Sequence, residues 1–396
     1  MVKFVHLADC HLGGWRQPEL QDLNFQSFQK VVEVILAENP DFVLISGDLF
    51  DSAYPPIEIL KETFAEFKKI SDARIPVYLI AGSHDFSSSG KTFLDVLEKA
   101  GFCKNVTNYE YQEDGSIKLI PYMHGNIAIY GYPGRKSGME IKDLKNVYFD
   151  SVNQFTIFML HTTINEVATF GMESIDKRTL PLANYYALGH IHQVAHIEDC
   201  GQHFVYPGPV FPNNFQELAD LQMGSFQITE IADKIITKNI KIPTKEVVSI
   251  ETEIENALTA TEEIITSLDK YNLKDKIVLL KLFGDIKIGK SGDIQFDKIE
   301  EFVKKKEAYS YLRNISQLKT NDTEINLIDN NFENIDKIEE TIFKEYNKEN
   351  QNEFNKYLPQ LLNSLAIEKN EDEKSAVFED RLISELKNIL GIQDII

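Results

Sequence analysis

The chain has 396 residues, with 41 lysines and arginines against 62 aspartates and glutamates, so its net charge is −21. Hydrophobic residues make up 43% of the sequence, as in ordinary globular proteins, which excludes wholesale disorder. The acidic charge excludes a protein that coats DNA nonspecifically, because such proteins bind by neutralising phosphates with cations.

The few cysteines, none of them in a C-x-x-C pair, indicate a reducing compartment. The first residues lead directly into a strand pattern rather than into a signal peptide. The apolar runs are far shorter than the roughly 18 residues that a membrane span requires. We therefore expect a cytoplasmic protein.

The first 230 residues alternate short apolar runs with helical patterns, which is typical of βαβ units. The spacing of apolar residues predicts helices at 25–38, 57–70 and 91–100. The runs that predict strands lie at 4–8, 42–46, 77–81, 127–130, 155–160 and 185–188. Residues 1–230 are therefore interpreted as one α/β domain.

The pattern changes after about residue 230. Strands are predicted at 236–252 and 276–288 and helices at 252–270 and 295–308, so residues 231–320 are interpreted as a smaller α+β domain. Residues 321–331 are rich in Asn and Asp and predict a linker. Residues 332–396 carry two apolar stripes at helical spacing, which predict a helical hairpin. These stripes either dock on the chain itself or bind a helix of a partner.

Short polar blocks directly follow the apolar runs of the first domain. In an open parallel sheet, residues just beyond the carboxyl ends of the strands line one crevice. Side chains from distant parts of the chain should therefore converge at one edge of the sheet. The candidates are Asp9, His11, Asp48, Ser83, His84, His161, His190 and His192.

Mixed histidine and aspartate ligands suit a divalent metal such as Mn, Fe or Zn better than Mg or Ca. This many ligands favour two ions over one, and Asp48 is the expected bridge, because one carboxylate can bind two ions. Two ions would lower the pKa of a bound water and stabilise both oxygens of an in-line phosphoryl displacement. A single histidine is more commonly a hydrogen-bonded structural residue, which is the interpretation of His6, His124, His196 and His203.

In their order along the chain, these blocks resemble those of the calcineurin-like metallophosphoesterases. Residues 6–13, 46–51 and 186–192 resemble the SbcD family in more detail. Its members are nuclease subunits of the double-strand-break repair complex, and the eukaryotic counterpart is the meiotic-recombination nuclease. The resemblance implies a β-sandwich flanked by helices, a capping domain at 231–320 and C-terminal helices that bind an SMC-like coiled-coil ATPase. It also implies a homodimer formed through the helices at 57–70 and 91–100.

The resemblance further implies two Mn²⁺ ions per subunit and a role for each candidate. The first metal would be held by Asp9, His11, Asp48 and His192, and the second by Asp48, Ser83, His161 and His190. His84 would stabilise the transition state and protonate the leaving oxygen, and Asp85 would orient His84. The sequence departs from the family at Ser83, where the family has asparagine. A serine hydroxyl is a shorter and weaker ligand, so the second metal is expected to bind more weakly or through a water.

The function that the resemblance implies is a two-metal DNA nuclease, both 3′→5′ exonuclease and endonuclease, that acts with the ATPase in double-strand-break repair. A general phosphodiesterase or phosphatase is one alternative. A catalytically weak scaffold, in which Ser83 fails to support the second metal, is another. The acidic charge argues against DNA, so much of the affinity for DNA would have to come from dimerisation and from the ATPase.

Overall fold

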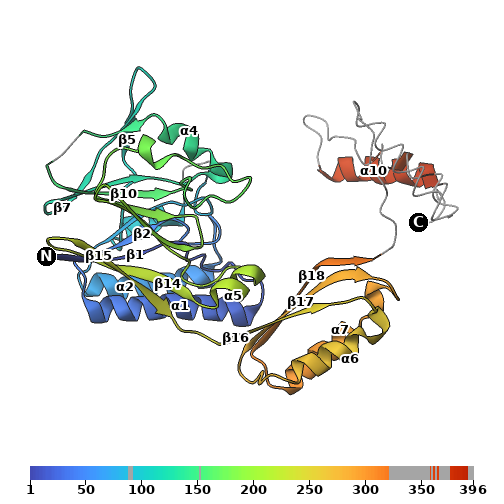
Figure 1. Cartoon of the computed structure of the whole chain (residues 1–396). Helices are drawn as coiled ribbons and strands as arrows, with labels where there is room; N and C mark the ends of the chain where they lie inside the picture. The colour runs from blue at the N-terminus through green and yellow to red at the C-terminus, as the bar shows by residue number, and fades with distance from the viewer. Residues whose placement is uncertain are drawn as a thin grey trace. The chain divides into compact units, whose positions relative to one another are not determined.

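The computed structural model describes residues 1–87, 92–150, 153–320 and 375–390, together with the isolated positions 357, 360, 361 and 364 (Figure 1). The chain divides into two compact units. The first comprises Met1–Gly284 and Ile288–Leu318, and the second comprises Asp285–Lys287 and Lys319–Ile396. Each unit is described on its own.

Two six-stranded sheets form the core of the first unit. The first sheet has the order β15-β14-β1-β2-β3-β4, with β1 (Val2–Leu7), β2 (Phe42–Ser46), β3 (Val77–Ile80), β4 (Lys104–Asn105), β14 (Gly224–Ile231) and β15 (Ile235–Ile242). The second has the order β12-β13-β11-β10-β8-β7, with β7 (Tyr122–His124), β8 (Ile127–Tyr132), β10 (Phe155–His161), β11 (Tyr185–Gly189), β12 (Val194–Asp199) and β13 (Gln202–Pro207). The central pairs β1–β2, β2–β3, β8–β10 and β10–β11 are parallel.

The two sheets pack face to face through an apolar layer. Phe4 and Phe42 stack with ring centroids 5.1 Å apart, and the ring of Tyr185 from the second sheet meets Phe4 edge-on. Ile157 and Met159 of β10 complete this layer and are fully buried. The predicted β-sandwich is therefore confirmed.

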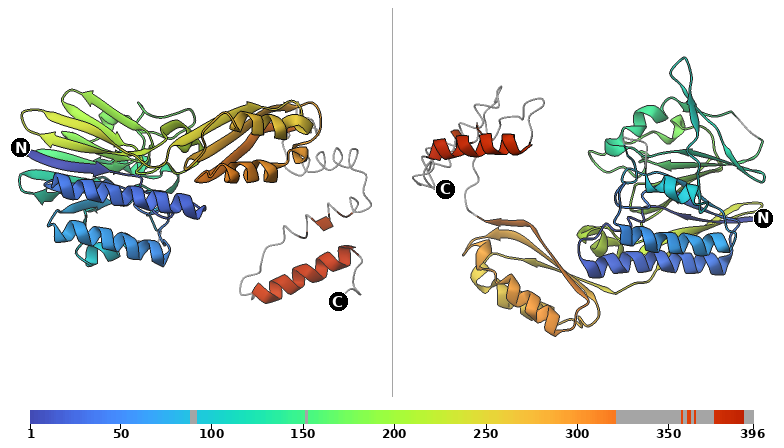
Figure 2. Two further views of the ribbon diagram at one scale, coloured as in Figure 1. Left: turned by 90° about the horizontal axis from the view of Figure 1, so that it is seen from below. Right: turned by 180° about the vertical axis from the view of Figure 1, so that it is seen from behind.

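Helices cover the outer face of the first sheet. These are α1 (Pro18–Glu38), α2 (Ile57–Asp72) and α3 (Phe93–Lys99), and α1 and α2 lie side by side in both views of Figure 2. The second sheet is covered by α4 (Glu140–Leu144) and by a small sheet of β5 (Tyr109–Tyr111), β6 (Ile117–Leu119) and β9 (Val147–Tyr148). Because both faces of the central strands are buried, these strands are mostly apolar, and every residue of β2 is buried.

Two local predictions need correction. Helix α1 begins at Pro18 rather than at residue 25, because proline is well suited to the first helical turn, where its missing N–H costs nothing. The single strand predicted at 236–252 is two strands. Its first part is β15, which pairs with β14 and completes the sandwich.

Residues 247–320 contain the sheet β16-β17-β18, with β16 (Val247–Glu253), β17 (Ile277–Ile286) and β18 (Ser310–Thr320). They also contain α6 (Ala257–Leu268) and α7 (Phe296–Lys305), which pair with each other. An apolar cluster joins this sheet to the sandwich, where Ile277 and Leu279 share a core with Trp15 and Leu20. These elements have the α+β pattern expected after residue 230, and nearly all of their residues belong to the same compact unit as the sandwich.

The C-terminal unit contributes α10 (Ser375–Leu390), which corresponds to the second helix of the predicted hairpin. Ser364 is buried, and its hydroxyl donates to Glu385 Oε1 of α10 at 3.1 Å. The predicted linker at 321–331 and most of the predicted first helix lie outside the described residues. Of the helices that the structure describes, none is long and apolar enough to cross a membrane.

Candidate metal centre

The predicted site residues meet where parallel strands of both sheets end. Asp9 and His11 follow β1, Asp48 follows β2, and residues 83–85 follow β3. His161 is the last residue of β10, and His190 directly follows β11. The crevice therefore lies between two sheets rather than at the edge of one open sheet. Three groups of side chains bring their ligand atoms within 4.8 Å of one another, namely Asp9/His11/His192, His11/Asp48/His84 and Asp9/Asp48/His161.

The first group is built around two histidines that face each other. The Nε2 atoms of His11 and His192 lie 3.1 Å apart, and His192 Nε2 lies 3.8 Å from Asp9 Oδ1. The other ring nitrogens are held by carboxylates, His11 Nδ1 by Asp51 Oδ1 at 3.1 Å and His192 Nδ1 by Glu217 Oε1 at 3.0 Å. A carboxylate at Nδ1 fixes the tautomer that keeps a lone pair on Nε2, as in metal-ligating histidines.

The second group is built around His161, which is buried completely. Its Nδ1–H donates to the carbonyl oxygen of Ser46 at 2.9 Å, so Nε2 is the ring nitrogen left to face the metal centre. This Nε2 atom lies 3.2 Å from Asp48 Oδ2 and has no hydrogen-bond partner among the described residues. The ring of His190 is 5.1 Å from that of His161, and Ser83 Oγ donates to Asp48 Oδ2 at 3.4 Å.

Asp48 links the two groups. Its Oδ2 atom lies 3.6 Å from His11 Nε2 and 3.2 Å from His161 Nε2. Asp9 also contributes to both, because its carboxylate accepts from the backbone N–H of His190 at 3.0 Å and lies 3.9 Å from His161 Nδ1. The donor set of carboxylates and lone-pair imidazoles fits divalent transition-metal ions. The buried Nε2 of His161, which faces Asp48 without a well-aligned hydrogen bond, is an atom that such an ion would bind.

The backbone at these residues adopts an uncommon conformation. Asp9, His11, Asp48 and His190 have φ values of 52°, 43°, 50° and 88°, in the left-handed region that non-glycine residues rarely occupy. Gly47 has a φ of 89°, and a Cβ there would overlap the ring of His161. Strained backbone persists where surrounding structure enforces it, and it is concentrated at functional sites.

The electrostatics of the cluster favour a bound cation. Burial alone lowers the pKa of His161, but the carboxylates of Asp48 and Asp9 outweigh burial and raise it to about 10. Burial likewise raises the pKa of Asp48, but His161, His11 and His84 reverse that effect and lower it. Burial and the charge of His161 lower the pKa of His190 to about 4, so its imidazole is neutral and able to ligate.

The predicted orientation of His84 by Asp85 needs correction. The Asp85 carboxylate is buried and accepts from the backbone N–H groups of Leu49 and Phe50, both at 2.9 Å, so it holds the loop that follows Asp48. Asp51 takes the predicted place, because its carbonyl oxygen accepts from His84 Nδ1 at 2.8 Å. The His84 side chain is 45% exposed and its ring lies 4.7 Å from that of His11. It is therefore open to a substrate.

Asp51 and Glu217 are the functional candidates that sequence reasoning missed. Asp51 lies three residues beyond Asp48, but a carboxylate in a loop has no periodicity that reveals its target. Glu217 lies on α5 (Phe215–Leu221), 25 residues after its partner His192. Only the fold brings these pairs together.

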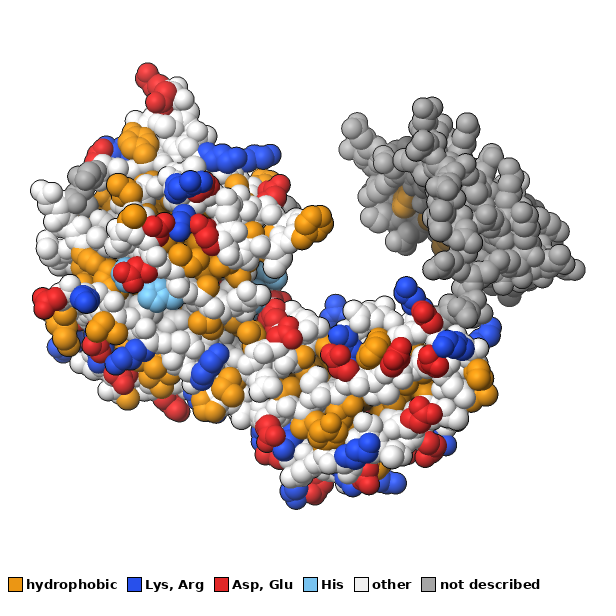
Figure 3. Space-filling model, in the orientation of Figure 1, with side chains coloured by type: hydrophobic (Ala, Val, Ile, Leu, Met, Phe, Trp, Pro, Cys, Tyr) orange, Lys and Arg blue, Asp and Glu red, His pale blue; other side chains and the backbone are white. Residues whose placement is uncertain are grey.

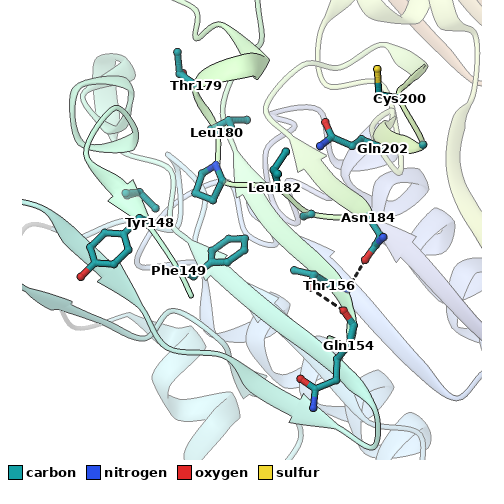
Figure 4. Close-up of a pocket in the computed structure, with 14 residues that line it drawn as sticks. Tyr148, Phe149, Gln154, Thr156, Thr179, Leu180, Leu182, Asn184, Cys200 and Gln202 are labelled. Carbon is teal, nitrogen blue, oxygen red and sulfur yellow. Dashed lines mark hydrogen bonds between the residues drawn. The ribbon is translucent and has the colours of Figure 1, made fainter. Parts of the chain in front are cut away.

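A separate cavity of about 590 Å³ lies at the opposite ends of β10 and β11 (Figure 4). Thr156, near the start of β10, and Asn184, just before β11, line it, and the backbone N–H of Thr156 donates to Asn184 Oδ1 at 2.8 Å. None of the candidate metal ligands is among its lining residues. This cavity is therefore not part of the site.

Comparison with known families identifies the class of protein. The family described as calcineurin-like phosphoesterase matches residues 2–194, just under half of the chain, and this segment is similar to that family. The prediction of a metal-dependent hydrolase is therefore confirmed.

The chain is also similar in sequence to curated archaeal proteins that carry the name "DNA double-strand break repair protein Mre11". The protein of Archaeoglobus fulgidus is 26% identical over 343 residues, which are 79% of this chain and 74% of the relative. That of Methanocaldococcus jannaschii is 36% identical over 204 residues, 48% of this chain and 52% of the relative. That of Methanococcus maripaludis is 31% identical over 236 residues, 55% of this chain and 60% of the relative. The matches thus span about half to three quarters of these relatives, and the resemblance to SbcD-type metallophosphoesterases is confirmed.

Proposed function

We propose that this chain is a two-metal DNA nuclease, with 3′→5′ exonuclease and endonuclease activity, that acts in double-strand-break repair. The observation that carries the proposal is the shared position of Asp48, whose Oδ2 atom lies within 3.6 Å of His11 Nε2 and 3.2 Å of His161 Nε2. One carboxylate between two groups of ligands is the arrangement that a pair of ions requires. The names of the relatives support DNA as the substrate.

Each metal is assigned its own ligands. One ion would be held by Asp9, His11, Asp48 and His192, and the other by Asp48, Ser83, His161 and His190, so that Asp48 is shared. When bound, Mn²⁺ ions lower the pKa of a water nucleophile and stabilise the charge that develops on the phosphate oxygens. Asp51 and Glu217 accept from the Nδ1–H groups of His11 and His192, so that Nε2 of each neutral imidazole is the nitrogen available to ligate.

His84 acts on the leaving group. Its Nδ1–H donates to the carbonyl oxygen of Asp51, and its half-exposed ring presents Nε2 to the substrate. As the phosphorus–oxygen bond breaks, protonated Nε2 donates its proton to the leaving oxygen. Asp85 supports this geometry indirectly, because it fixes the loop that carries Asp48.

Ser83 weakens the second metal without abolishing turnover. Its hydroxyl donates to Asp48 Oδ2 at 3.4 Å, whereas every charged or imidazole ligand of the family pattern is present around it. Without metals, the buried charged ligands would be unpaired, which is costly in free energy, so a site that had lost its function is expected to lose these ligands first. We expect Ser83→Asn to lower the Mn²⁺ concentration needed for half-maximal activity, which a Mn²⁺ titration of hydrolysis measures. Equal titrations for the two proteins would contradict this role of Ser83, whereas hydrolysis by Ser83→Asn and none by the wild type would favour the scaffold interpretation.

The affinity for DNA is proposed to depend on partners. On the face that Figure 3 shows, lysine and arginine side chains alternate with aspartate and glutamate rather than forming a continuous basic surface. A homodimer formed through α2 and α3, and an SMC-like coiled-coil ATPase bound by residues 332–396, would supply additional contacts. In this proposal residues 1–230 cleave, residues 231–320 cap the substrate and residues 321–331 link these parts to the helical tail. The complex would act on chromosomal DNA in the cytoplasm.

A general phosphodiesterase is the second candidate, favoured by the acidic surface. The two are separated by comparing Mn²⁺-dependent hydrolysis of linear duplex DNA with that of bis(p-nitrophenyl) phosphate by the same preparation. The nuclease proposal predicts a much larger kcat/KM for DNA. A larger kcat/KM for the small diester would favour the general phosphodiesterase.

A further inference from the structure

A chain of buried hydrogen bonds lies between the two sheets, directly beneath the metal centre. His6 on β1 is fully buried, with its Nε2 atom 3.1 Å from Ser46 Oγ and its Nδ1 atom 3.2 Å from Tyr185 Oη. The chain continues from Tyr185 Oη to Thr229 Oγ1 at 3.4 Å and from there to Thr237 Oγ1 at 3.1 Å. Apolar residues such as Phe4 and Phe42 form the rest of this layer.

The direction of these hydrogen bonds can be assigned from their donors. Thr229 Oγ1 donates to Tyr185 Oη, so the hydroxyl proton of Tyr185 is directed to Nδ1 of His6. Burial lowers the pKa of His6 to about 3, so its ring carries only one proton. Because Tyr185 donates to Nδ1, that proton is on Nε2 and is directed to Ser46 Oγ. The backbone carbonyl of Leu188 is a further partner of the His6 ring.

Ser46 connects this chain to the metal centre. Its side chain accepts from His6, and its backbone carbonyl oxygen accepts from His161 Nδ1 at 2.9 Å. The hydrogen bond to the carbonyl oxygen fixes the tautomer in which His161 Nε2 faces Asp48. His6 thus joins β1, β2 and β11, and through Ser46 reaches β10. Each of these strands ends at a candidate ligand.

We propose that His6 is a positioning residue for the metal centre, because it holds Ser46 where its carbonyl oxygen orients His161. The inference rests on the proposed two-metal function. An apolar side chain in its place would preserve the packing but would leave the Ser46 and Tyr185 hydroxyls without their buried partner. The sequence interpretation of His6 as merely structural is therefore extended to a role in metal binding.

The test compares Mn²⁺ binding in the wild type with that in His6→Leu, using calorimetric titration and the EPR signal of exchange-coupled Mn²⁺ pairs. Wild type should bind two ions and show the coupled signal. His6→Leu should bind the second ion about 10–100-fold more weakly, the usual range when an outer partner of a ligand is lost. His6→Gln, whose amide can still donate to Ser46 Oγ, should recover most of the affinity.

The matched control is His203→Leu, which removes another buried histidine whose ring pairs with His196 rather than with the metal centre. It should leave both Mn²⁺ affinities unchanged. Should His6→Leu not fold, Tyr185→Phe makes the same comparison by removing the donor to His6 Nδ1, with a smaller loss. The inference would be overturned if His203→Leu weakened Mn²⁺ binding as much as His6→Leu does. It would also be overturned if His6→Leu and Tyr185→Phe both bound two ions with wild-type affinity. Neither result would affect the proposed function. A wild type that binds fewer than two ions would overturn the proposed function as well.

Discussion

Asp48 lies at the point where the ligands from the two sheets meet, and its Oδ2 atom is close to both His11 and His161. The sequence predicts this residue and the other candidates, because each follows an apolar run at the end of a strand. It does not predict Asp51 or Glu217, because their partners are determined by tertiary contacts. The role predicted for Asp85 is wrong for the same reason, since its neighbour in sequence is not its partner in space.

Glu217→Gln should weaken Mn²⁺ binding about 10–100-fold, the usual effect when a carboxylate that hydrogen-bonds a metal-ligating histidine is lost. Glutamine keeps the size of the side chain and the contact with His192 Nδ1 but removes the negative charge that increases the basicity of that imidazole. Titration calorimetry measures the effect. Glu110→Gln, at an exposed position on β5, is the control and should bind like the wild type. Indistinguishable affinities for Glu217→Gln and Glu110→Gln would contradict the role of Glu217.

The pKa of His161 predicts a pH dependence of the metal-free protein. This pKa is raised from its ordinary 6.5 to about 10, because the attraction of Asp48 and Asp9 exceeds the penalty of burial. The folded state therefore binds a proton that the unfolded state has lost between these values. The resulting stabilisation is complete below pH 6.5 and disappears as the pH rises through about 10.

Thermal unfolding in the presence of a chelator should therefore show a larger fall in Tm from pH 6.5 to pH 10 for the wild type than for His161→Gln. The glutamine variant is the control, because it cannot bind the proton. Parallel pH profiles for the two proteins would show that His161 does not have a raised pKa in the folded protein.

Elements of the fold were predictable where a local pattern determines them. Strand β2 matches the predicted 42–46, and α2 begins at the predicted residue 57. The division of the strands into two sheets was not available from residue patterns, because central strands buried on both faces have the same composition in either arrangement. The sandwich was predicted only through the resemblance to a known family. It determines that ligands from β1 and β2 face ligands from β10 and β11.

The contact between the cap and the sandwich predicts a specific loss of stability. Leu279 on β17 is fully buried in the cluster that includes Trp15 and Leu20. Leu279→Ala should lower the free energy of unfolding by about 2–5 kcal/mol, through lost burial and a residual cavity. Ile315→Ala, at a 39% exposed position on β18, should lower it by less. Denaturant unfolding measures both, and equal losses would contradict the shared core.

At the scale of the whole molecule, the net charge of −21 must be reconciled with a polyanionic substrate. In the proposed site, two divalent ions would neutralise part of the charge of the clustered carboxylates where the phosphate would bind. The negative charge on the rest of the protein would still repel DNA, so tight binding of DNA is expected to require partners. The helical tail is the proposed point of contact with one of them.

Deletion of residues 321–396 tests this division of roles. The truncated chain should retain Mn²⁺-dependent hydrolysis of a small phosphodiester, because every proposed ligand lies between Asp9 and His192. It should no longer bind the SMC-like ATPase in a pull-down assay. Retention of ATPase binding would assign the interface to another part of the chain, and loss of hydrolysis would show that the tail contributes to the site.

The central claim is a pair of metal ions that shares Asp48 and cleaves DNA. Its most direct test is the release of nucleotides from linear duplex DNA by the wild type and by Asp48→Asn, each with Mn²⁺ and with a chelator. Asparagine preserves the size of the side chain but removes the charge between His11 and His161. The wild type should release nucleotides with Mn²⁺ but not with the chelator, and Asp48→Asn should release none under either condition. Release by Asp48→Asn at the wild-type rate, or no release by the wild type with Mn²⁺, would contradict it.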